Sequence, residues 1–135
     1  MKAIPSTHKN RIIILLTITI LSLSTKIMAQ EKNHIYRIAK IQVDPAQLTQ
    51  YNSALKEQMT TAIRVEPGVL SYYEVADKKE PSHITIFEIY ADSTAYKAHL
   101  QAPHFKKYKE TAQHMVTALE VVDVDLIGTA KKPGM

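Results

Sequence analysis

The apolar positions of this chain recur in two different periods, and these periods predict its secondary structure. Runs rich in β-branched and aromatic residues, with partial alternation of apolar and polar positions, predict strands. These runs lie at 34–43, 69–77, 83–91 and 120–128. Apolar residues three and four positions apart predict helices after Asp44 and after Asp92, a residue type that caps helix N-termini. We expect the first helix to stop at the segment EPG (66–68). We expect the second, kinked or restarted at Pro103, to keep helical spacing as far as Leu119.

The resulting order is strand, helix, strand, strand, helix, strand. This order is the split βαβ arrangement of a ferredoxin-like α+β domain, with the helices on one face of a single sheet. The other sheet face is still partly apolar, and in the first strand it carries Tyr36 and Ile38. Such a face needs a cover, and a second copy of the chain is the simplest one. The pattern therefore predicts a homodimer whose two sheets pack face to face.

The first 29 residues have the layout of a secretory signal peptide. Three basic residues precede a mostly apolar run at 12–23, and the small residue Ala29 precedes a candidate cleavage point. The run is shorter than the about 20 apolar residues that a membrane-spanning helix needs. We therefore expect an exported chain, periplasmic or secreted, that keeps no membrane anchor after cleavage. Residues 30–135 would form its one folded domain, with a core at 34–128.

Removal of this leader changes the charge of the chain. The full sequence has 17 Lys and Arg against 13 Asp and Glu, and the leader holds four of the basic residues and none of the acidic ones. The remaining chain has 13 of each and is formally neutral. It therefore lacks the basic surface that supplies most nucleic-acid affinity, and nucleic acid is not an expected partner. The sequence contains no cysteine, so disulfides are excluded as a source of stability.

The segment EPGVLSYYEVADKKEPSHITIFEIYADSTAYKAHLQAPHFKKY (66–108) resembles the antibiotic biosynthesis monooxygenase family, especially its small quinol monooxygenase-like members. The resemblance extends over nearly all of 34–128 and implies a dimeric α+β barrel of the ferredoxin-like type. It also implies oxidation of a small quinol or dihydroxyaromatic by O2, without metal or flavin. Other members of the wider superfamily degrade haem or isomerise small metabolites. Tyr90 stands where the family often has tryptophan, and the chain has none, which weakens a haem-degrading role.

Glu88 is a candidate catalytic residue on the third predicted strand. It shares one strand face with Ile84, Ile86 and Tyr90, and a carboxylate among such neighbours is seldom buried without a partner. It either lies in a cavity between sheet and helices, where it anchors a histidine or a substrate hydroxyl, or forms a structural pair. The candidate partners for such a pair are Arg37, Lys40 and a tyrosine hydroxyl.

His99 is the candidate general base, and His104 follows it by five residues. On a straight helix the two would lie about 140° apart, so they share a site only if Pro103 bends the chain. Helical metal pairs use a spacing of four, and no third ligand is obvious, so we predict no metal site. No other cofactor is predicted either.

Tyr90, Tyr72, Phe105 and His104 are the candidate substrate contacts. In the resulting hypothesis, His99 with the help of Glu88 removes a proton from the aromatic substrate, while Tyr90 and Phe105 bound the ring beside O2. Tyr72 and Tyr73 point to opposite sheet faces, so at most one of them can line the cavity. Two alternatives stay open. One is a non-catalytic exported binder of a small hydrophobic or phenolic ligand, and the other is an isomerase of a small metabolite.

Overall fold

The structure is a computed structural model and describes residues 33–134. This part of the chain contains four strands, three α-helices and one short 3-10 helix. The predicted leader at 1–29 lies outside this part. The elements are β1 (Ile35–Val43), η1 (Pro45–Gln47), α2 (Leu48–Val65), β2 (Val69–Ala76), β3 (His83–Tyr90), α3 (Ser93–Gln101), α4 (Pro103–Ala112) and β4 (Val116–Val124). None of the described helices has both the length and the apolar character that crossing a membrane requires.

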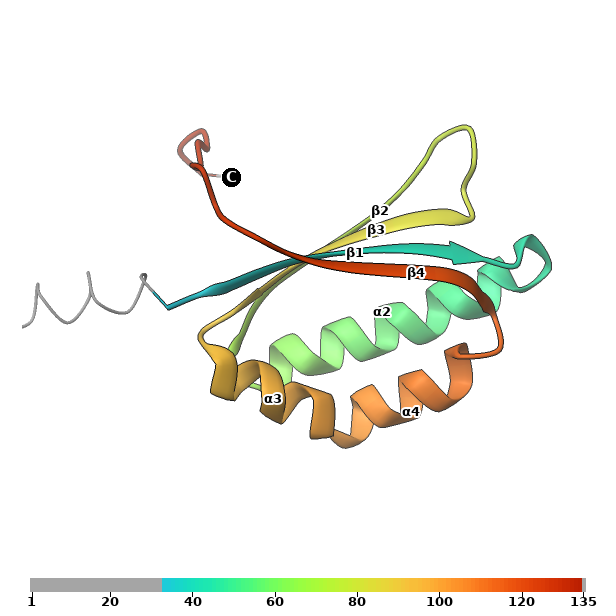
Figure 1. Cartoon of the computed structure of the whole chain (residues 1–135), viewed down its shortest axis with the longest axis horizontal. Helices are drawn as coiled ribbons and strands as arrows, with labels where there is room; N and C mark the ends of the chain where they lie inside the picture. The colour runs from blue at the N-terminus through green and yellow to red at the C-terminus, as the bar shows by residue number, and fades with distance from the viewer. Residues whose placement is uncertain (1–32, 135) are drawn as a thin grey trace, which may run out of the picture. The chain divides into compact units, whose positions relative to one another are not determined.

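The strands form one antiparallel sheet in the order β2-β3-β1-β4. The helices form a second layer on one face of this sheet, with α2 and α4 side by side beneath it (Figure 1). This is the predicted ferredoxin-like α+β fold. The register places Arg37 on β1 between Glu88 on β3 and Asp123 on β4. Because cross-strand partners point to the same face, all three side chains face the helix layer.

Local capping sets most of the element boundaries. The Asp44 side chain accepts a hydrogen bond from the Ala46 amide at 2.9 Å and opens the turn η1, after which α2 continues to Val65. The Asp92 side chain accepts from the Ala95 amide at 2.8 Å and opens α3. Pro103 ends this helix and occupies the first turn of α4, where its missing N–H costs nothing. The predicted helix restart at this proline is confirmed.

The predicted position of the last strand is wrong by about four residues. β4 spans Val116–Val124 rather than 120–128, and α4 ends at Ala112, so the helical spacing that reaches Leu119 does not mark a helix. Pairing with β1 sets these limits. Because β1 begins at Ile35, residues that follow β4 have no neighbouring strand to pair with.

The hydrophobic core lies between the sheet and the helices. Its buried residues come from the helix-facing side of β1 and β3, from α2, and from the end of the α4 region: Ala39, Ile41, Val43, Tyr51, Leu55, Ile84, Ile86, Ala112 and Met115. The odd positions of the first predicted strand are therefore its core positions. Tyr90 and Val69 pack with Ala62 in a smaller cluster.

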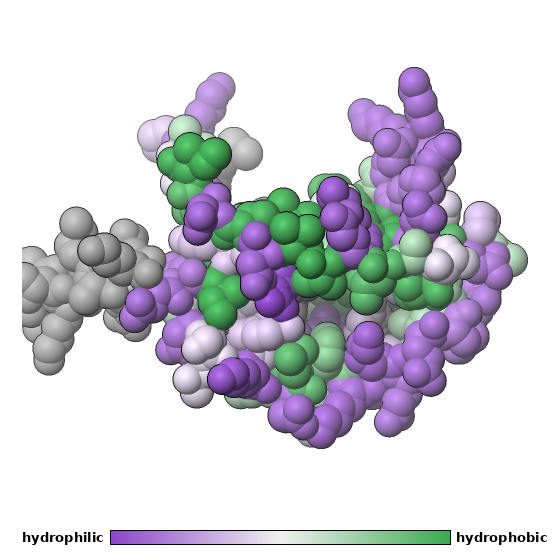
Figure 2. All heavy atoms as spheres, in the orientation of Figure 1, coloured by the Kyte–Doolittle hydropathy of each residue, from purple (hydrophilic) through white to green (hydrophobic). Residues whose placement is uncertain are grey.

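The opposite sheet face is apolar, and no element of residues 33–134 packs on it. Its aromatic rings form a row across three strands, in which Phe87 stacks on Tyr73 on one side and on Tyr36 on the other. Tyr73 is 53% exposed, and Val75 beside it is 60% exposed. Figure 2 shows apolar atoms gathered along the strand layer, whereas the outer surface of the helices is mainly polar. The homodimer that would cover this face stays a prediction.

Candidate active site

A cavity of about 420 Å³ lies between the sheet and the helices. Five of the six predicted site residues line it: Glu88 and Tyr90 from β3, Tyr72 from β2, His99 from α3 and Phe105 from α4. Parts of the wall are exposed, since the edge strand β4 also contributes to it. The remaining wall is largely apolar. A mainly apolar lining with a few polar groups is typical of sites that bind small organic molecules.

His104, the sixth predicted residue, is not part of this wall. It lines a smaller hollow of about 90 Å³ between α2 and α4. Its side chain is 15% exposed and points back toward the end of α2. The structure therefore places His104 behind His99 rather than beside a substrate.

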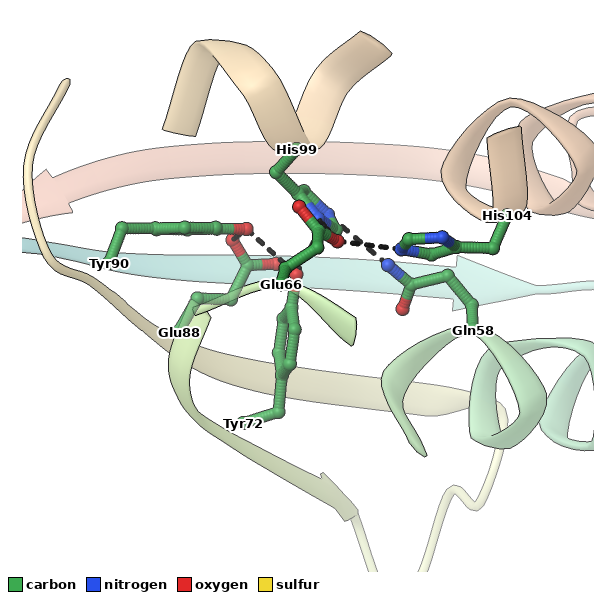
Figure 3. A network of polar contacts seen from close by, with 7 residues as sticks. All are labelled: Gln58, Glu66, Tyr72, Glu88, Tyr90, His99 and His104. Atoms are coloured by element: carbon green, nitrogen blue, oxygen red, sulfur yellow. Dashed lines mark hydrogen bonds and ion pairs between the residues drawn. The ribbon is translucent and has the colours of Figure 1, made fainter. Parts of the chain in front are cut away.

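Glu66 brings the two histidines together. Its Oε1 atom lies 2.8 Å from His99 Nδ1 and 2.6 Å from His104 Nε2 (Figure 3). The break at Pro103 makes this possible, because the two histidines approach the same oxygen from two separate helices. A carboxylate only accepts hydrogen bonds, so each imidazole donates an N–H to it.

A close approach between two chain segments places Glu66 under α3. Glu66 directly follows α2, and two residues later the chain passes so near α3 that a Cβ at Gly68 would lie 2.4 Å from the Cβ of Ala95. The Gly68 carbonyl also accepts a hydrogen bond from the Ala91 amide at 2.9 Å. Only glycine fits this contact without a shift, and the contact holds the Glu66 carboxylate against His99.

His99 is 1% exposed, and both of its ring nitrogens are engaged. Because Nδ1 carries the proton that Glu66 accepts, Nε2 of the neutral ring is an acceptor. The Tyr72 hydroxyl lies 2.9 Å from Nε2, and the Gln58 amide nitrogen lies 3.2 Å from it. Burial lowers the pKa of His99, although the bond to Glu66 opposes this effect. The ring is therefore neutral near pH 7 and presents a lone pair toward Tyr72.

Tyr72 connects His99 to Glu88 through a second tyrosine. The Tyr72 and Tyr90 hydroxyl oxygens lie 2.8 Å apart, and Tyr90 Oη lies 3.0 Å from Glu88 Oε2. Burial raises the pKa of Glu88, against the opposing effects of the Tyr90 hydrogen bond and Arg37. Burial also raises the pKa values of both tyrosines, so they stay neutral. We call the series Glu88, Tyr90, Tyr72, His99 and Glu66 the hydrogen-bond chain.

The hydrogen-bond chain has two self-consistent proton arrangements. With Glu88 protonated, Glu88 donates to Tyr90, Tyr90 donates to Tyr72, and Tyr72 donates to His99 Nε2. With Glu88 ionised and His99 protonated, every direction reverses: His99 Nε2 donates to Tyr72, Tyr72 donates to Tyr90, and Tyr90 donates to Glu88. A proton that enters at Glu88 can therefore reach the imidazole through two hydroxyl groups without forming a tyrosinate.

The predicted link between Glu88 and His99 is thus indirect. The carboxylate that contacts His99 is Glu66, which the sequence marks only as part of the segment that stops the first helix. His99 also contacts Gln58, which lies on the otherwise apolar face of α2. Glu66, His99 and His104 place one potential metal-ligand atom each within 4.8 Å of one another, and no other such trio occurs in residues 33–134. Glu66 is the third potential metal ligand that the sequence did not reveal. It already accepts hydrogen bonds from both histidines.

Residues 34–111 match the family model described as Antibiotic biosynthesis monooxygenase. The chain is also similar to a crystal structure from Bacteroides thetaiotaomicron, provisionally described as an antibiotic biosynthesis monooxygenase. The two are 48% identical with a TM-score of 0.72, over 75% of this chain and 96% of the other. Among curated proteins, none matches this chain in sequence.

Two more distant structures have the same fold. A Lactobacillus acidophilus protein, provisionally described as a monooxygenase, is 27% identical with a TM-score of 0.65, over 69% of this chain and 50% of that one. A Caulobacter crescentus protein, provisionally described as an antibiotic biosynthesis monooxygenase, is 23% identical with a TM-score of 0.67, over 71% and 92% of the two chains. The last likeness concerns the fold alone.

Proposed function

Because the chain belongs to the antibiotic biosynthesis monooxygenase family, we propose that it oxidises a small quinol or dihydroxyaromatic with O2 and without a cofactor. The family and the similar structures support a monooxygenase, and the cavity supports the finer proposal. The observation that carries it is the hydrogen-bond chain, because it links a carboxyl on the cavity wall to a buried neutral imidazole. Such a link supplies the base that the removal of a phenolic proton requires.

The first step is the removal of a proton from the bound ring. The substrate hydroxyl gives its proton to Glu88 or to the Tyr72 oxygen, and the proton moves along the hydrogen-bond chain to His99 Nε2. Glu66 then faces an imidazolium through Nδ1 and stabilises its charge. His104 holds the same carboxylate from the other side and keeps it oriented.

This proton transfer is unfavourable in free energy, because the substrate hydroxyl is a weaker acid than the imidazolium of His99. A phenolic O–H has a pKa of about 10, like that of tyrosine, and the pKa of His99 lies below its ordinary value of about 6.5. The gap of at least about 3.5 pKa units corresponds to about 5 kcal/mol. The site must therefore stabilise the anion, and the reaction with O2 must consume it.

The proposed reaction needs no electron source other than the substrate. The ring anion reduces O2, one oxygen atom forms a new bond to a ring carbon, and the O–O bond breaks. The second oxygen atom leaves as water with two protons from the substrate, one of which returns from His99. The product is a hydroxyquinone, so the substrate supplies every electron that O2 accepts.

Export and dimerisation belong to the same proposal. The leader at 1–29 supports an exported protein, which would act on a substrate outside the cytoplasm. The uncovered aromatic row of Tyr36, Tyr73 and Phe87 supports a homodimer that packs through this sheet face. The cavity lies on the other face of the sheet, so such a dimer would contain two separate cavities.

O2 uptake by the purified protein without residues 1–29, freed of metal ions and offered a panel of small quinols, tests the proposal. The expected result is uptake above the autoxidation rate that is lost in His99→Ala. Because His99 is buried, the melting temperature of the variant must show that it is folded. No uptake on any quinol, with ring compounds still raising the melting temperature, would favour the binding protein instead.

A further inference from the structure

Arg37 brings a largely buried positive charge to the same cavity, and the proposed proton transfer does not use it. Its side chain is 15% exposed and forms part of the cavity wall. The guanidinium carbon lies 4.0 Å from the centre of the Tyr96 ring, a cation–π contact that fixes the position of the group. On its other side, Nε donates to Asp123 Oδ1 at 2.7 Å, and Nη2 lies 2.6 Å from the same oxygen.

Asp123 neutralises Arg37 only in part. A guanidinium has five N–H donors, and Asp123 presents one oxygen to two of its nitrogens. The Asp123 side chain is 71% exposed, so water and salt screen its charge. The Arg37 side chain is only 15% exposed, and an ionic contact is stronger where less water surrounds it. Part of the guanidinium therefore remains available to a group inside the cavity.

The other ionisable groups on the cavity wall leave a positive surplus. Among the described residues that line the cavity, Lys109 is the second cation and Glu88 is the one acidic residue. Burial raises the pKa of Glu88, so this carboxyl is neutral over a wider pH range than an exposed one. Burial lowers the pKa of His99, so the imidazole adds no charge near pH 7. A ring compound in the cavity thus meets apolar walls and unbalanced positive charge.

We infer that Arg37 is an anion-binding residue and that the cavity takes aromatic rings that carry a carboxylate beside their hydroxyl groups, the dihydroxybenzoate class. The planar guanidinium matches a carboxylate in shape and binds it through charge-assisted hydrogen bonds. The dihydroxy ring in this inference rests on the proposed function. The preference for negative charge is a binding property and needs no turnover.

Calorimetric titration of the purified protein under nitrogen tests the preference. The two probes are 2,5-dihydroxybenzoate and its methyl ester, which share a ring but differ in charge. The acid is expected to bind about tenfold or more tightly than the ester. Arg37→Gln removes this difference and leaves the ester affinity unchanged, whereas Arg37→Lys keeps part of it.

Two further variants sharpen the test. Asp123→Asn releases Arg37 from its exposed partner, so the affinity for the acid rises by about threefold or more while that for the ester stays the same. Lys40→Gln is the matched control: Lys40 lies on the same strand and faces Glu120 on β4 at 3.3 Å, but it is 60% exposed and does not line this cavity. It is expected to change neither affinity.

Equal binding of acid and ester, tighter binding of the ester, or no binding of either overturns the inference. A preference for the acid over the ester that persists in a folded Arg37→Gln variant also overturns the inference. If that variant does not fold, unchanged acid binding in Asp123→Asn counts against the inference in its place. O2 uptake is measured separately. A preference without uptake contradicts the proposed function and leaves the inference standing, and uptake of neutral quinols without a preference does the reverse.

Discussion

Replacement of Glu66 by glutamine tests the hydrogen-bond chain at the group that faces both histidines. Glutamine keeps the size and one acceptor oxygen but loses the charge. A hydrogen bond to a charged group contributes about 1.5–3 kcal/mol, against about 1 kcal/mol for a neutral one, so the imidazolium loses about 0.5–2 kcal/mol of stabilisation. If that charge is present in the transition state, kcat falls by about 2- to 30-fold.

The pH dependence of the same variant gives an independent readout. The base works in its neutral form, so kcat/KM decreases as the pH falls through the pKa of His99, which already lies below its ordinary value. Loss of the Glu66 charge lowers this pKa further, by roughly one unit. The acidic limb of the profile therefore moves to lower pH while the plateau drops. Initial rates of O2 uptake, measured from about pH 4.5 to pH 8 across the range where histidine titrates, record both effects.

Glu80 provides the matched control. Its Oε2 atom lies 2.9 Å from His83 Nδ1, but both side chains are exposed and remote from the cavity wall. Glu80→Gln should change neither the plateau nor the pH profile. A Glu66→Gln plateau equal to that of the wild type, or an acidic limb that moves to higher pH, would refute the reasoning, because even a charge difference of about 0.5 kcal/mol lowers the rate by about twofold.

Three other variants address the hydrogen-bond chain, its support and the outer sheet face. Tyr72→Phe removes the hydroxyl between Tyr90 and His99, so kcat should fall by about 10- to 100-fold at an almost unchanged melting temperature. An unchanged kcat would mean that the proton takes another route. Gly68→Ala forces a shift at α3 and should cost about 1–3 kcal/mol in denaturant unfolding. A cost near zero would show that the contact is loose. Tyr73→Lys puts a charge on the aromatic row and should give monomers in light scattering. Dimers that persist would place the interface elsewhere.

The fold could be predicted because its signals are local. Asp92 and Pro103 mark the start of α3 and the break before α4 through their own backbone chemistry, and the structure confirms both. The last strand could not be positioned in this way. Its limits depend on which residues pair with β1, and β1 lies more than seventy residues earlier in the chain. The spacing that reached Leu119 fitted a helix equally well until this pairing was known.

The site could be predicted only in part, because its contacts join distant segments. Glu88, Tyr90 and Tyr72 were recognised as candidates from strand alternation and residue type. Glu66 was not recognised, because it precedes a Pro-Gly stop that explains its position without any functional role. A signal existed for Gln58, which is the polar member of an apolar stripe, three residues after Leu55 and four before Ala62. It is buried there, and its partner is His99.

The position of β4 at the sheet edge separates residues that shape the cavity from residues that stabilise the fold. Leu119 and Val121 line the cavity, yet they are 53% and 48% exposed because β4 is an edge strand beyond the reach of the helices. Substitutions at these two positions alter the shape of the cavity without disturbing the core beneath β1 and β3 or the aromatic row on the outer face. Descendants of one ancestral sequence could therefore acquire new substrates through changes along this strand while keeping the same hydrogen-bond chain.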